Sequence, residues 1–69
     1  MRLSTRNQLP GTVESVTTGE AMAVVKVRLD GGQLVTSAIT KDAAEDLALA
    51  AGSAVTVLVK STEVMLATD

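Results

Sequence analysis

The sequence has 69 residues, with six Lys or Arg, eight Asp or Glu, and no Cys, His, Phe, Tyr or Trp. This composition excludes disulfides and removes the usual ligands of zinc, copper and haem. The formal net charge of −2 and the lack of aromatic residues disfavour binding to nucleic acid or anionic membranes. No apolar run is long enough to span a membrane and no signal peptide is recognisable, so we expect a cytoplasmic protein.

Short segments rich in β-branched residues are separated by turn residues along the chain, which is typical of a compact β domain. We expect the first strand to bend or bulge near its start, because Pro10 and Gly11 interrupt it. The second strand alternates between two faces, and the turn Asp30-Gly31-Gly32 joins it to the third as a hairpin. The predicted strands cover residues 8–16, 20–29, 33–40, 54–60 and 64–67.

Residues 42–51 change to helical residue types between the third and fourth strands. Asp42 and Glu45 resemble a capping box, although Thr40 is an alternative cap, and Gly52 is well placed to end the helix. Five short strands with one helix between the third and the fourth predict an all-β fold, an OB-like small barrel.

Several apolar residues point away from the predicted core. A domain of this size buries only about 60% of the surface that its unfolded chain exposes, so it needs further stabilisation. Without disulfides or a metal, oligomerisation is the simplest source. We expect some of these residues in a subunit interface; the alternative is scattered exposed apolar residues, which are normal. The residues are Met22, Val24, Leu58 and Met65.

No pattern in the sequence indicates catalysis. Without His and Cys, proton transfer and nucleophilic attack would depend on Asp, Glu, Lys, Ser or Thr. The cluster Asp42, Glu45 and Asp46 is explained by a helix start, where acidic residues are favourable. The pair Gly31-Gly32 is a hairpin turn, and no phosphate-binding fingerprint is present. We therefore expect a binding protein rather than an enzyme.

Two segments carry donors suited to a small tetrahedral dianion. Residues 4–7 (Ser-Thr-Arg-Asn) offer two hydroxyls, a guanidinium and an amide, and residues 60–62 (Lys-Ser-Thr) offer an ammonium and two hydroxyls in a turn with free backbone N–H groups. Thr40 adds a hydroxyl at another strand end, near unpaired helix N–H groups. Taken singly, Arg6 and Lys60 are better explained as solvated surface charges.

These same segments carry a family resemblance. STRNQLPGTV at 4–13 and AAGSAVTVLVKST at 50–62 are the most specific, and AMAVVKVRLDGGQLVTSAIT at 21–40 and VMLA at 64–67 extend the match over nearly the whole chain. In them the sequence resembles the Mop family of molybdate-binding proteins, the molbindins. The resemblance implies a single OB-like domain over residues 1–69 that binds molybdate, and often tungstate, as the oxyanion and needs no organic cofactor.

The resemblance also implies a homo-oligomer, a hexamer built as a trimer of dimers, with oxyanion sites between subunits and a second kind of site near the threefold axis. Ala43 stands where many relatives carry a Ser that reaches the anion, which removes one hydroxyl from the site. The site residues implied are Ser4, Arg6, Thr40, Lys60 and Ser61, with Thr5, Asn7 and Thr62 as further candidates.

The function expected from this resemblance is intracellular storage and homeostasis of molybdate. One alternative is a molybdate-sensing domain of a larger regulator or transporter, but the initial Met and the five-strand pattern favour a free-standing protein. Another is an OB-type module for nucleic acid or peptide, which the missing aromatics and the negative charge disfavour.

Overall fold

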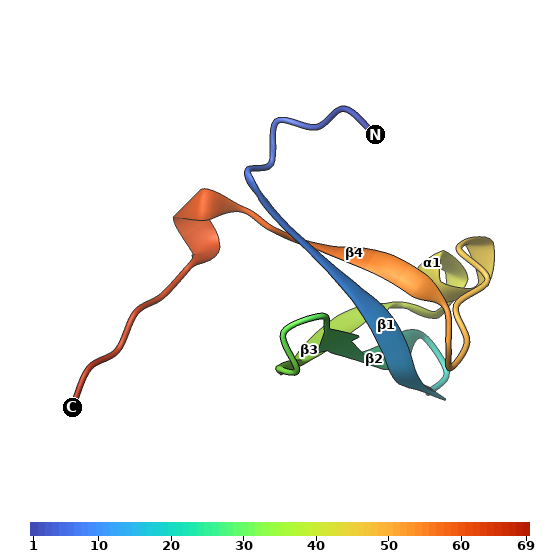
Figure 1. Ribbon diagram of the computed structural model, residues 1–69. Coiled ribbons are helices and arrows are strands. Elements are labelled where there is room, and N and C mark those ends of the chain that lie inside the picture. The colour runs from blue at the N-terminus through green and yellow to red at the C-terminus, as the bar shows by residue number, and fades with distance from the viewer.

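Four antiparallel strands form one strongly curved sheet in the order β3-β2-β1-β4, which leaves an open half-barrel (Figure 1). The computed structural model describes all 69 residues. Its elements are β1 (Asn7–Thr18), β2 (Met22–Leu29), β3 (Leu34–Thr40), helix α1 (Lys41–Asp46), β4 (Ala54–Val59) and the 3-10 turn η1 (Ser61–Glu63). The all-β class with one helix between the third and fourth strands is as predicted.

Strand β1 is the longest strand and organises the sheet, because it pairs with both β2 and β4. The expected bulge near Pro10 is wrong: the register shift lies between Val13 and Ser15. Pro10 is paired with Thr56 of β4, and on its other side β2 has already ended, so its carbonyl accepts from the N–H of the turn residue Asp30 at 3.2 Å. Its missing N–H therefore removes no hydrogen bond to β2, and the chain needs no bulge there.

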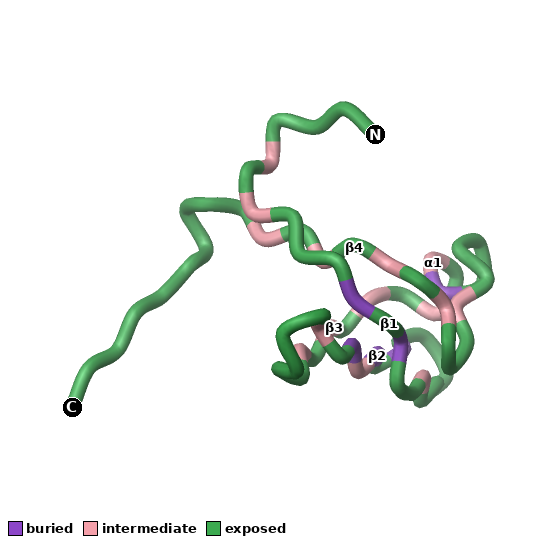
Figure 2. The backbone as a smooth tube through the Cα atoms, viewed as in Figure 1, coloured by how far each residue is buried: buried purple, intermediate pink, exposed green.

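The core lies on the concave face of the sheet and is small. Only six of the 69 residues are buried, and they lie on β1, β2 and α1 (Figure 2). Partly buried side chains from all four strands and the loop after α1 surround them, so the concave face stays partly open. The buried apolar residues are Val13, Ala23, Val25, Val27 and Ala44.

Helix α1 is shorter than the predicted helix over 42–51, and its cap is Thr40 rather than Asp42. The Thr40 hydroxyl accepts a hydrogen bond from the Ala43 N–H at 3.1 Å. The helix ends early because Ala48 adopts a left-handed conformation, with φ of 52°, and this turns Leu49 toward the core. Gly52, with φ of 95°, belongs to the next turn and does not end the helix. No helix has the length and apolar composition needed to cross a membrane.

The predicted fifth strand at residues 64–67 does not form within the chain. After η1 the tail runs away from the sheet without a strand partner (Figure 1). Its apolar side chains are open to solvent, and Met65 and Leu66 are each 92% exposed. The 3-10 turn directs the tail away from both sheet edges, so the single chain is a four-stranded half-barrel rather than a closed five-stranded barrel.

Candidate functional site

The two donor segments found in the sequence meet in one pocket. Asn7 pairs with Val59, so the residues before β1 and those after β4 leave the sheet at the same end (Figure 1). Between them lies a pocket of about 370 Å³ with no hydrophobic residue in its lining. Both segments therefore meet within a single chain. The lining residues are Ser4, Thr5, Arg6, Lys60, Ser61 and Thr62.

The pocket carries uncompensated positive charge. Arg6 and Lys60 line it together with four hydroxyl side chains and no carboxylate. The single ion pair of the chain joins Glu14 and Arg28 at 2.7 Å, on the outer face of the sheet and away from the pocket. Since neither Arg6 nor Lys60 has an acidic partner, the pocket attracts anions although the protein as a whole is acidic.

Free backbone donors add to these side chains, as the sequence predicted for the turn at 60–62. In η1 the N–H of Glu63 donates to the Lys60 carbonyl at 2.8 Å, and the N–H of Val64 donates to the Ser61 carbonyl at 3.4 Å. The N–H groups of Ser61 and Thr62 precede these bonds and donate none within the chain. Such groups at the start of a helical turn are available to an anion.

Two amide side chains next to the pocket are used within the protein. The Asn7 Nδ2 donates to the Val59 carbonyl at 3.0 Å, and Asn7 does not line the pocket. The Gln8 Nε2 donates to the Thr5 carbonyl at 2.8 Å. Sequence reasoning did not single out Gln8, because a lone exposed glutamine forms no recognisable pattern.

Thr40 lies apart from this pocket. It pairs with Met22, and Met22 follows the end of β1 that is opposite to Asn7. Thr40 is therefore near the other end of the sheet, where its hydroxyl caps α1. Within one chain the structure does not bring Thr40 to the residues that line the pocket.

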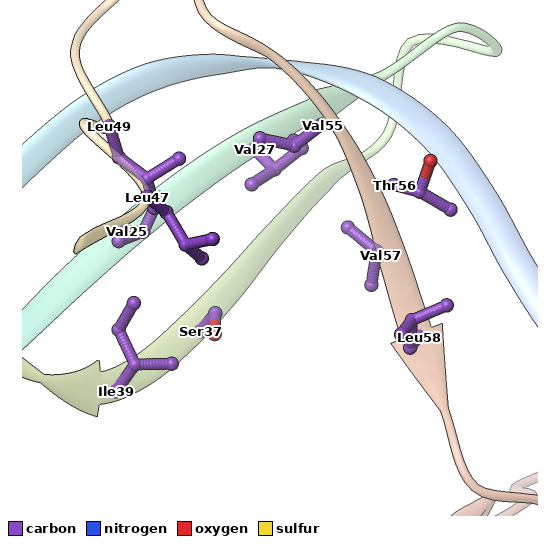
Figure 3. Close-up of a pocket in the computed structure, with 10 residues that line it drawn as sticks. All are labelled: Val25, Val27, Ser37, Ile39, Leu47, Leu49, Val55, Thr56, Val57 and Leu58. Atoms are coloured by element: carbon purple, nitrogen blue, oxygen red, sulfur yellow. The ribbon is translucent and has the colours of Figure 1, made fainter. Parts of the chain in front are cut away.

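A second hollow of about 230 Å³ opens on the concave face and has a different character (Figure 3). Eight of its ten lining residues are hydrophobic, none is charged, and they come from β2, β3, β4 and the loop after α1. It has no donors for an oxyanion beyond Ser37 and Thr56. The chain also has no cluster of His, Cys, Asp or Glu that could hold a metal ion.

The model of the TOBE domain family matches residues 3–66. The chain belongs to the TOBE domain family. It is 44% identical over 66 residues to molybdenum-pterin-binding protein 3 from Clostridium pasteurianum, covering 96% of this chain and 97% of that relative. Among solved TOBE-like structures, the apo form of MopII from Clostridium pasteurianum superimposes with a TM-score of 0.92 at 39% identity, covering 97% of this chain and all of that one. The resemblance to the Mop family is thereby confirmed.

A longer protein contains the same fold. The solved structure of the cytoplasmic molybdate-binding protein ModG, with molybdate bound, superimposes with a TM-score of 0.90 at 40% identity. The match covers 94% of this chain and 46% of the ModG chain. The TOBE fold of this chain therefore also occurs as one part of a longer polypeptide.

Proposed function

We propose that this TOBE-domain protein binds molybdate, and also tungstate, as the intact tetrahedral oxyanion. The observation that carries the proposal is the pocket between residues 4–6 and 60–62, which combines two cations, four hydroxyls and free N–H groups without a carboxylate. Two solved relatives support the same ligand, a molybdate-binding protein from Sporomusa ovata and ModG with molybdate bound, and molybdenum-pterin-binding protein 3 shares the metal in its name.

Each donor type suits a part of this task. Arg6 presents a planar fork to two oxygens, Lys60 supplies a compact charge, and the hydroxyls and N–H groups complete the shell. Binding leaves the anion unchanged, so no acid, base or nucleophile is required, and we propose a binding role rather than catalysis. Selection against the smaller sulfate would come from the size of the assembled site, which we expect to match the larger anion.

The proposed functional unit is a homo-oligomer, a hexamer arranged as a trimer of dimers. The pocket is open in a single chain, the apolar hollow on the concave face is uncovered, and the apolar tail has no partner. A neighbouring subunit supplies the second wall of the pocket and brings Thr40 to it. The four predicted interface residues are exposed in the single chain and available for such contacts: Met22, Val24, Leu58 and Met65.

Substitution of the two cations tests the site. We expect Arg6→Ala and Lys60→Ala each to weaken molybdate binding at least tenfold, because one hydrogen bond to a charged group contributes about 1.5–3 kcal/mol. Isothermal titration calorimetry measures the change. Lys26→Ala is the matched control, since the Lys26 Nζ bonds Thr36 at 2.8 Å and does not line the pocket. Wild-type affinity in both pocket variants would contradict the proposed site.

The proposed physiological role is storage and homeostasis of molybdate in the cytoplasm, which agrees with the description of ModG as a cytoplasmic protein. A second candidate role is molybdate sensing within a larger protein. The match to ModG covers only 46% of the ModG chain, so the same fold occurs within a longer polypeptide. The two roles share one binding site. A sensing role requires a further domain in the native protein, and a storage role does not. The mass of the protein purified from its source distinguishes the two roles.

A further inference from the structure

The two halves of the pocket are held in different ways. The C-terminal half, residues 60–62, overlaps η1 and is closed by the hydrogen bond from the Glu63 N–H to the Lys60 carbonyl. The N-terminal half, residues 4–6, belongs to no helix or strand. Its one hydrogen bond within the chain is the contact from the Gln8 Nε2 to the Thr5 carbonyl at 2.8 Å. The conformation of the segment that carries Arg6 therefore depends on Gln8.

A side-chain hydrogen bond also joins the two strand ends that lie next to the pocket. Asn7 is the first residue of β1 and Val59 the last of β4, so each lies next to one half of the pocket. The Asn7 Nδ2 donates to the Val59 carbonyl at 3.0 Å in a partly buried position. This bond ties together the two strand ends from which Arg6 and Lys60 project.

We propose that Asn7 and Gln8 are positioning residues of the oxyanion site. Asn7 sets the separation of the two halves, and Gln8 sets the conformation of residues 4–6. The inference rests on the proposed function, and it replaces the expectation that Asn7 is itself a candidate ligand. The physical reason is that ordering a loop upon binding costs conformational entropy, so a donor set that is held beforehand binds more tightly.

Two substitutions remove these bonds with little other change. Gln8→Met keeps the length of an exposed side chain and removes its amide donor, and Asn7→Leu keeps the branched shape. We expect each to raise the Kd for molybdate roughly fivefold, the effect of one ordinary hydrogen bond. We also expect Asn7→Leu to reduce the preference for molybdate over sulfate, measured as the ratio of the two Kd values. Gln33→Met is the matched control, because Gln33 is exposed in the β2–β3 turn and does not line the pocket.

A second measurement separates positioning from a general effect on stability. In the ligand-free protein, we expect Gln8→Met to lower the backbone NMR order parameters of residues 4–6 while the Tm stays at the wild-type value. The inference is overturned if both variants bind molybdate as tightly as wild type, if the order parameters do not change, or if a fall in Tm accompanies the loss of affinity. A wild-type protein that binds neither molybdate nor tungstate contradicts the proposed function instead.

Discussion

Gly11 is in tight contact with the neighbouring strand β2. A Cβ built on this buried residue would stand 2.7 Å from the Arg28 carbonyl oxygen and 2.9 Å from the Val27 Cγ1. The close contact, and not an unusual backbone conformation, requires glycine at this position. Gly11 pairs with Leu29 of β2 and with Val55 of β4, so it lies at the point where β1 begins to have a neighbour on both sides.

We expect Gly11→Ala to lower the free energy of unfolding by about 1–3 kcal/mol, the usual effect of overpacking. Chemical denaturation measures the change. Gly19→Ala is the control, since the nearest atom to a Cβ at that position is the Met22 carbonyl oxygen at 3.6 Å. Equal free energies of unfolding for the two variants would contradict this prediction, because they would show that β1 and β2 can move apart at Gly11 without destabilising the protein.

The two segments that line the candidate pocket could be predicted from the sequence, while their role in binding stays a prediction. Residues 4–6 and 60–62 are recognisable because cations and hydroxyls cluster at the ends of two strands, and those strands pair in the structure. The roles of Asn7 and Gln8 could not be predicted, because they depend on the backbone carbonyls that the two side chains reach. Thr40 has no partner in the pocket of its own chain, so its contribution stays a prediction about the assembly.

Helix α1 depends on one side chain at its start. The Thr40 hydroxyl accepts from the Ala43 N–H, while Asp42, the residue first considered as the cap, makes no side-chain bond to the helix backbone. The helix has only six residues, too few to be stable without its cap and its packing. Ala44 provides that packing as its one buried residue.

We expect Thr40→Val to lower the free energy of unfolding by about 1 kcal/mol, because it removes the capping hydroxyl and keeps the β-branched shape. Thr40→Ser, which keeps a hydroxyl, should remain near wild type, and Asp42→Ala should have a smaller effect than Thr40→Val. Thermal unfolding followed by circular dichroism compares the three variants. A larger decrease in the free energy of unfolding for Asp42→Ala than for Thr40→Val would indicate that Asp42, and not Thr40, caps the helix.

The strands and the helix were predictable to different degrees for physical reasons. Alternation over residues 20–29 and the turn at 30–32 are local signals, and β2, β3 and β4 form close to the predicted ranges. The helix ends early because Leu49 returns to the core, which is a tertiary effect. Residues 64–67 have the composition of a strand, but the turn η1 carries them away from both edges of the sheet, so they have no strand to pair with in the single chain (Figure 1).

The single chain is an open half-barrel. Its curved sheet leaves an apolar hollow uncovered, and its tail exposes the side chains of Met65 and Leu66. Exposed apolar surface of this kind marks an interaction site on a soluble protein. We therefore propose that assembly and oxyanion binding are linked, with a neighbouring subunit covering both the apolar hollow and the open pocket.

Removal of the apolar tail tests this connection. Deletion of residues 65–69 should leave the circular dichroism spectrum of the sheet unchanged, since these residues form no element in the single chain. We expect the deletion to lower the oligomer mass measured by light scattering, because apolar contact area between subunits is lost. Deletion of residues 68–69 alone, which retains the apolar residues, is the control. An unchanged mass in the longer deletion would exclude the tail from the interface.

Native mass spectrometry in the presence of molybdate, tungstate or sulfate reports subunit number and bound anions together, and so tests oxyanion binding and assembly in one experiment. We expect a hexamer that retains molybdate or tungstate and does not retain sulfate. A monomer without any bound oxyanion would contradict this expectation.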